Sequence, residues 1–140
     1  MADRSPRPRP LPQPTPETRH FWDGTQAGEL RLQRCADCNH VYFPPRPLCP
    51  ACSSRRVEVF AASGRGKLAS YVINHRPHPS FDGPYAIAVV ELDEGPTMLA
   101  NIVDCEQTPE ALVLDMPLEV TFEDNGGIAI PLFRPQESQR

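Results

Sequence analysis

The chain has 140 residues and a formal net charge of −4, with 39% hydrophobic and 23% charged residues. This length suits one domain, or two very small ones that share an interface. No window approaches the roughly 18 consecutive apolar residues of a membrane span, and the first residues lack the apolar core of a signal peptide, so we expect a cytoplasmic protein without membrane contact.

The first segment is dominated by proline. Residues 5–16 read SPRPRPLPQPTP and hold six of the chain's 18 prolines. Such a sequence favours polyproline II and has little to bury, so residues 1–14 are predicted to form a disordered or extended arm. Residues 136–140 are predicted to form a disordered tail.

A helix is predicted over residues 15–28. Thr15 offers a hydroxyl cap, Pro16 suits the first helical position, and Gly28 suits the end of the helix. Phe21 and Trp22 form the only large apolar patch of this segment. The helix should therefore dock through these two rings.

Residues 29–62 are predicted to form a ribbon of short strands around a metal ion. Leu30 and Leu32 alternate with polar residues and lead into the first of two C-x-x-C pairs, which are ten residues apart. Two such pairs can place four thiolates at about 2.3 Å from one tetrahedral Zn²⁺. The predicted ligands are Cys35, Cys38, Cys49 and Cys52.

The same cysteines admit two other interpretations. Iron in a rubredoxin-like site suits the same four sulfurs. A thioredoxin-type dithiol is weaker, because no βαβ pattern surrounds either pair and a single dithiol does not explain two pairs at matched spacing. A closed four-thiolate shell leaves no coordination position for a substrate, so the metal should stabilise the fold and not catalyse.

Residues 63–135 have the composition of an all-β domain. Turn signals separate five candidate strands, with one short helical turn at TPEALVL between the third and the fourth. This order predicts a five-stranded OB-fold barrel, with an SH3-like barrel or a small sandwich as alternatives, and makes the whole chain mainly β. The candidate strands are residues 67–75, 85–93, 97–105, 118–124 and 128–133.

Enzymatic chemistry has little support in these residues. Cys105 ends a predicted strand without an identifiable base beside it, and His75 and His78 lie in a proline-flanked turn that typically faces solvent. No nucleophile elbow, phosphate loop, H-E-x-x-H motif or dinucleotide fingerprint is present. No catalytic residue is therefore assigned, and a hydrolase using His75 or Cys105 is the enzymatic alternative.

Nucleic acid is the ligand that zinc ribbons and OB barrels suggest first, but the charge opposes it. The net charge of −4 becomes about −6 once four thiolates and one Zn²⁺ are counted. Tyr85 is the only aromatic residue in the two strands that carry the reading face of an OB fold. The stretch AIAVV is apolar on both alternating faces, which predicts cover by a partner protein instead, with a nucleic-acid-binding module as a further alternative.

The chain resembles the DUF35 type of protein, in which a rubredoxin-like zinc ribbon precedes an OB fold. The resemblance spans residues 16–135 and implies an accessory subunit of a CoA-thioester-processing enzyme. The partner would be thiolase-like, either a thiolase or a steroid side-chain aldolase, with a MaoC-type enoyl-CoA hydratase as the alternative. The stretches that carry the resemblance are FWDG, GELRLQRCADCNHVYFPPRPLCPAC, SGRGKLASYVI, PYAIAVVELDEGP and MPLEVTFED.

This resemblance implies a hetero-oligomer in which one Zn²⁺ is structural and acyl-CoA binds at or near the interface. Phe21 and Trp22 would contact the partner. The cations best placed by sequence to meet CoA phosphates are Arg65, Lys67 and Arg76, beside the SGRGK turn and the HRP loop.

The chain departs from the family pattern at one point in each cysteine pair. Asn39 and Ser53 stand where glycine commonly follows the second cysteine. We therefore expect altered knuckle geometry with the metal retained.

Overall fold

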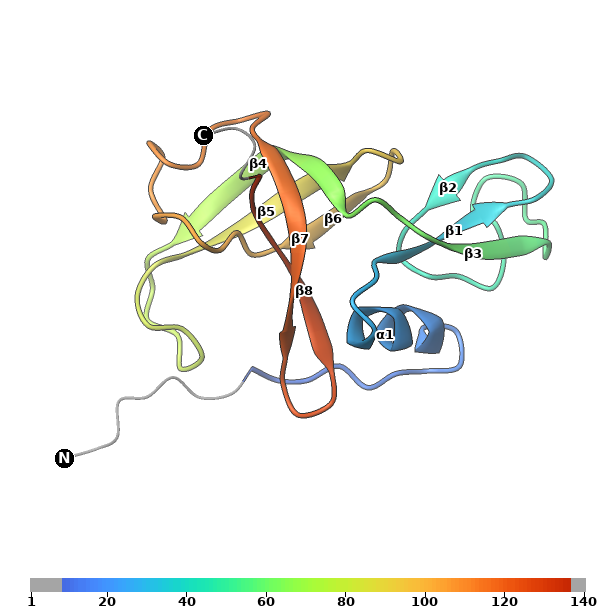
Figure 1. Cartoon of the computed structure of the whole chain (residues 1–140), viewed down its shortest axis with the longest axis horizontal. Coiled ribbons are helices and arrows are strands. Elements are labelled where there is room, and N and C mark those ends of the chain that lie inside the picture. Colours follow the sequence, from blue (N-terminus) through green and yellow to red (C-terminus); the bar gives the residue numbers. More distant parts are fainter. Residues whose placement is uncertain (1–8, 137–140) are drawn as a thin grey trace.

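The computed structural model describes residues 9–136 and shows one helix and two small sheets within them (Figure 1). A ribbon and a barrel lie side by side, with the helix packed between them. The elements are α1 (Arg19–Gln26), β1 (Arg31–Cys35), β2 (Val41–Tyr42), β3 (Val57–Ala61), β4 (Arg65–Asn74), β5 (Tyr85–Leu92), β6 (Thr97–Ala100), β7 (Pro117–Asp124) and β8 (Ala129–Pro135).

The ribbon is a three-stranded antiparallel sheet with the order β2-β1-β3. Leu30 and Leu32, which alternate along the sequence, are both buried, because β1 lies against the helix and the barrel. The last residue of β1 is Cys35, so the strand delivers the first cysteine to the metal-binding end of the ribbon.

The second sheet has five strands in the order β6-β5-β4-β7-β8, and all paired neighbours are antiparallel. A parallel bridge between Ile102 and Phe133 links its two edges, so the sheet curls into the partly open, five-stranded barrel of an OB fold. The predicted mainly β fold is confirmed, and the SH3-like and sandwich alternatives are not what forms.

The third barrel strand is shorter than the sequence predicted. It ends at Ala100 and not at residue 105. The side-chain amide of Asn101 donates to the carbonyl of Ala86 (2.7 Å), and beyond this point the chain leaves β5 to pair with Phe133 of β8. Alternating apolar residues continue through this change of partner, so the pattern could not mark it.

The helix begins later than predicted. Thr18, and not Thr15, precedes its first residue, and residues 16–18 form a turn in which the N–H of Thr18 donates to the carbonyl of Thr15 (3.1 Å). Phe21 is 3% exposed and contacts the rings of Trp22 and Phe43. The helix thereby joins β1 and the barrel in one continuous hydrophobic core.

The two ends of the described chain are held by specific contacts. Residues 1–8 of the predicted arm and residues 137–140 of the predicted tail lie outside the described residues. Residues 9–14 contain neither helix nor strand, but the Arg9 side chain packs on the barrel. At the other end, Gln136 bonds through its main chain and side chain to Pro117 and Leu118.

Backbone conformation and close packing explain the two glycines of the SGRG motif. Gly64 has a φ of +76°, and a Cβ on Gly66 would lie 2.5 Å from the carbonyl oxygen of Glu91. The backbone of β4 thus approaches β5 too closely for any side chain at Gly66.

Replacing Gly66 by alanine should lower the free energy of unfolding by about 1–3 kcal/mol, because the added methyl group must displace backbone. Thermal unfolding followed by circular dichroism measures the effect. Ser70→Ala, an exposed change on the same strand that adds no atom, is the control. Equal melting temperatures for the two variants would contradict the close approach.

Candidate metal centre and docking surface

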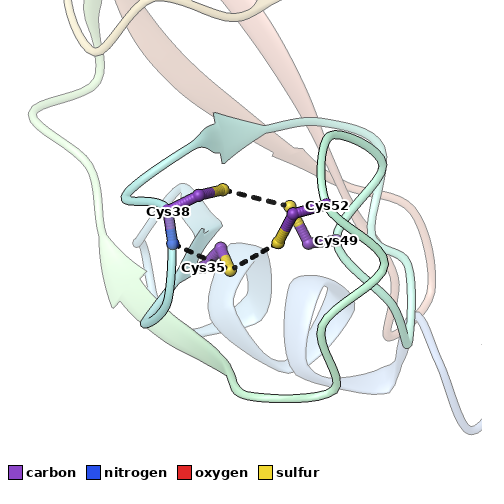
Figure 2. A group of neighbouring side chains, drawn as sticks. All are labelled: Cys35, Cys38, Cys49 and Cys52. Carbon is purple, nitrogen blue, oxygen red and sulfur yellow. Dashed lines mark hydrogen bonds between the residues drawn. The ribbon is translucent and has the colours of Figure 1, made fainter.

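The two cysteine pairs form knuckles with the same backbone hydrogen bonds. In the first knuckle the N–H of Asn39 donates to the carbonyl of Cys35 (2.9 Å), and in the second the N–H of Ser53 donates to the carbonyl of Cys49 (2.8 Å). The knuckles face each other across the ribbon, so the four cysteine side chains converge (Figure 2).

The spacing of the sulfurs fits a tetrahedral metal ion. The Sγ atoms of Cys35 and Cys52 are 3.6 Å apart, as are those of Cys38 and Cys49, and all four lie within 4.8 Å of one another. Four thiolates at about 2.3 Å from one ion are separated by roughly 3.8 Å. A disulfide would instead need about 2.0 Å between sulfurs.

The surrounding backbone favours negative charge on the sulfurs unequally. The N–H of Cys38, followed by that of Asp37, lowers the pKa of Cys35 to about 7 by stabilising its thiolate. The N–H of Ser54 acts in the same direction on Cys52, but contact with the Cys35 sulfur and burial outweigh it and raise that pKa to about 12. Four thiolates this close repel one another, so a bound dication is needed to keep them all deprotonated.

The expected change in knuckle geometry is wrong. Asn39 and Ser53 have φ values of 63° and 65°, which is the left-handed conformation that glycine adopts easily. The two knuckles therefore keep matching hydrogen bonds without glycine. Asparagine tolerates this conformation better than serine does, so the strain falls mainly on Ser53.

Replacing Ser53 by glycine should raise the melting temperature, since it removes roughly 1 kcal/mol of backbone strain. Differential scanning calorimetry of the metal-loaded protein measures the change. Asn39→Gly is the matched variant and should give a smaller increase. A lower melting temperature for Ser53→Gly would mean that its side chain stabilises the knuckle.

The structure does not bring the three predicted cations together. The Nζ of Lys67 lies 3.4 Å from the carboxylate of Glu91 and 3.9 Å from that of Asp115. Arg65 begins β4, whereas Arg76 lies beyond its other end, and a strand of this length spans on the order of 30 Å. These side chains cannot converge on one phosphate group.

The predicted partner contacts are reduced to one ring. Phe21 is only 3% exposed, so it offers almost no surface to a partner, although it is one of the residues that line the groove beside it. Trp22 is half-buried and lines an open groove of about 450 Å³ between α1, the 43–45 loop and the barrel. The residues around this apolar groove include Trp22, Phe43, Pro44, Ile87, Leu99 and Ile130.

A buried side chain positions the loop that forms one wall of the apolar groove. The Oε1 atom of Gln33 accepts the N–H of Arg46 (2.7 Å), and the hydroxyl of Tyr42 donates to the Arg46 carbonyl (3.3 Å). These bonds fix the FPPR loop against the ribbon. Phe43 and Pro44 are therefore held facing the barrel.

The outer surface of the barrel beside the apolar groove is also apolar, and Ile87 and Leu99 belong to both. Val72, Ile87 and Leu99 are 62%, 38% and 70% exposed. Val72 pairs with Ile87, and Leu99 pairs with Val89, so these side chains form one cross-strand patch on β4, β5 and β6. We call this patch, with the apolar groove, the apolar face. The AIAVV pattern indicated β5, but it did not reveal Val72, Leu99 or the groove.

The residues of the enzymatic alternative show no shared site. His75 is exposed, while His78 accepts the N–H of Ser80 (3.0 Å) and packs edge-on against Phe81. Cys105 follows β6 in a loop, where burial and then the nearby Asp104 raise its pKa. A thiol with a raised pKa is a poor nucleophile.

Comparisons with known proteins follow the same division into ribbon and barrel. A family model described as "ChsH2, rubredoxin-like zinc ribbon domain" matches residues 22–58, and one described as "ChsH2, C-terminal OB-fold domain" matches residues 60–123. The chain is 32% identical to a solved structure called "Ltp2-ChsH2(DUF35) aldolase", with a TM-score of 0.80, covering 89% of this chain and 98% of the other.

Two curated relatives add to this. A "DUF35 domain-containing scaffold protein" of Pyrococcus furiosus is 39% identical over 105 residues, which is 69% of this chain and 76% of the relative. A "Probable enoyl-CoA hydratase alpha subunit" of Thermomonospora curvata is 36% identical over 122 residues, 85% of this chain. Our chain spans only 38% of the length of that relative.

The fold and the four-cysteine site define a zinc-ribbon OB-fold protein. This chain belongs to the DUF35 family, in the form that the two ChsH2 domains describe. Among residues 9–136, no helix is long and apolar enough to cross a bilayer.

Proposed function

We propose that this chain is a non-catalytic subunit that docks through its apolar face on a CoA-thioester-processing enzyme of the thiolase type. The apolar face is the observation that carries the proposal, because Val72, Ile87 and Leu99 lie together on neighbouring strands beside an apolar groove, and a contiguous exposed apolar patch marks a protein interface where single exposed residues do not. The likeness to the Ltp2-ChsH2 aldolase supports this kind of partner. Acyl-CoA would bind at or near the interface.

The resident metal is proposed to be one structural Zn²⁺ per chain. The ribbon type and the sulfur spacing support zinc, and iron in the same four-sulfur set is the alternative. Cys35, Cys38, Cys49 and Cys52 would hold the ion. Since all four positions are taken by protein, the metal would fix the ribbon that positions the FPPR loop.

A hydratase is the second candidate partner. The relative from Thermomonospora curvata bears the name of an enoyl-CoA hydratase alpha subunit, and it is longer than this chain. A MaoC-type hydratase would use the same apolar face. The identity of the co-purified subunit distinguishes the two partners.

The test begins with the tagged chain, purified from an extract of its source. Mass spectrometry identifies the proteins that accompany it, and metal analysis of the same sample counts zinc and iron. The identified enzyme is then mixed with the purified chain, and complex formation is followed by light scattering. A stoichiometric complex with a thiolase-fold enzyme supports the proposal, whereas a chain that binds neither thiolase-fold nor hydratase protein overturns it.

Of the three predicted cations, we propose Arg65 as the one that contacts CoA. Lys67 already faces two carboxylates, and Arg76 lies beyond the other end of β4, far from Arg65 and Lys67. Arg65→Ala should raise the apparent KM of the complex for acyl-CoA severalfold without dissociating it. Steady-state kinetics measures this, with Arg76→Ala as the control. An unchanged KM would remove Arg65 from the CoA site.

A further inference from the structure

The N-terminal segment crosses the end of the barrel and places one side chain there. Figure 1 shows it running from beside the β4–β5 loop past the β7–β8 hairpin to α1. The Nη1 of Arg9 donates to the Oδ1 of Asn101 (3.0 Å), and its guanidinium lies 4.7 Å from the centre of the Phe81 ring. The carboxylate of Glu123 is 3.9 Å from its Nε.

The ring beneath the guanidinium is held from behind. Phe81 stacks on Tyr85 with ring centres 3.7 Å apart and planes 10° from parallel. His78 packs edge-on against both rings, and the Asn74 side chain donates to the Tyr85 hydroxyl (2.7 Å). The face of Phe81 is therefore presented by the barrel itself, and Arg9 is not needed to orient it.

The hydrogen-bond acceptor is oriented in the same way. The Nδ2 of Asn101 donates to the carbonyl of Ala86, which leaves its Oδ1 pointing toward Arg9. The side chain of Gln107 accepts the N–H of Ala86 and donates to the carbonyl of Ile102. These two bonds fix one wall of a hollow that lies behind Arg9. On the other side, Asn125 donates to the carboxylate of Glu123 (3.1 Å).

We propose that this end of the barrel is a binding site for the guanidinium group of an arginine in an extended peptide, and that Arg9 fills it in this chain. An aromatic face, an oriented amide oxygen and a carboxylate are complementary to a flat cation with several N–H donors. A lysine ammonium matches the charge and can donate hydrogen bonds, but it has no flat face to stack on the ring and no planar fork of N–H donors. The hollow behind Arg9, of about 260 Å³, is lined by Phe81, Tyr85, Asn101 and Gln107.

The location gives this guanidinium site a functional consequence. The loops after the first and fourth barrel strands, here residues 75–84 and 125–128, border the ligand-binding face of OB folds. Arg9 therefore holds the N-terminal segment across that face. Any molecule that binds there must either displace the Arg9 side chain or bury it, whichever enzyme the subunit serves.

Nuclear magnetic resonance of the full chain tests the proposal without any partner. Arg9→Ala should shift the side-chain amide signal of Asn101 and the ring signals of Phe81 and Tyr85. Adding L-arginine amide to this variant should move those signals back toward their original positions, and L-lysine amide should not. In the unsubstituted chain, where Arg9 is in place, the same addition should cause smaller shifts.

The control is Arg7→Ala, which removes the same charge from a position that is also flanked by prolines and should leave the signals unchanged. Signals that do not respond to Arg9→Ala would overturn the proposal. So would an equal response to lysine amide, which would show a merely acidic surface, or no response to arginine amide.

Discussion

Replacing Cys35 by serine should abolish stable metal binding and unfold the ribbon. Cys35 is fully buried at the end of β1, and its Sγ is one of the four that surround the proposed ion. Structural zinc contributes roughly 10–16 kcal/mol of binding free energy in zinc-finger peptides, so we expect a destabilisation on the order of 5 kcal/mol or more. Plasma mass spectrometry measures the metal content, and circular dichroism measures the melting temperature.

Cys105→Ser is the matched control for this experiment. It makes the same atomic exchange at the one cysteine that lies outside the four-sulfur group. We expect it to retain one metal ion per chain and a nearly unchanged melting temperature. If Cys35→Ser also kept its metal and its stability, the four cysteines would not form a structural metal centre.

Replacing Leu99 by aspartate should weaken binding to the enzyme subunit by about 100-fold or more, which corresponds to about 2.7 kcal/mol. Leu99 is 70% exposed and belongs both to the cross-strand patch and to the lining of the apolar groove, so the chain itself should fold normally. In the complex, the new carboxylate would be desolvated without a partner, and that penalty is large. Isothermal titration calorimetry with the identified enzyme measures the loss.

Leu114→Asp controls for the chemistry of this change. Leu114 is 58% exposed, but it lies in the loop before β7 and does not line the apolar groove. Both variants should melt at the temperature of the unsubstituted chain. If they bind the enzyme equally well, docking uses a surface other than the apolar face.

The parts of the fold that depend on local pattern could be predicted. Two C-x-x-C pairs at matched spacing predict a four-sulfur site wherever they fold, because each pair forms its own knuckle. Alternation indicated the barrel strands, and Gly64 and Gly66 marked a turn that leads into a tightly paired strand. Local pattern failed at Asn39 and Ser53, because the backbone adopts the left-handed conformation at both positions although neither residue is glycine.

The parts that depend on long-range packing could not be predicted. The apolar groove combines Trp22, Phe43 and Ile130, which no sequence pattern links. The helix begins later than predicted because residues 16–18 form a turn, so Thr15 does not cap the first turn of the helix. The three cations predicted to meet CoA do not form a cluster. Arg65 and Arg76 each lie beside a turn in the sequence, but these turns are at opposite ends of β4.

The shared core determines how this protein can be recombined with its relatives. Phe21 of the helix and Leu32 of the ribbon belong to the same buried cluster as Leu68 and Phe133 of the barrel. A chimera that grafts the ribbon of a relative onto this barrel would therefore create cavities or clashes at the seam. A functional chimera should therefore exchange helix, ribbon and barrel together, because the three share one hydrophobic core.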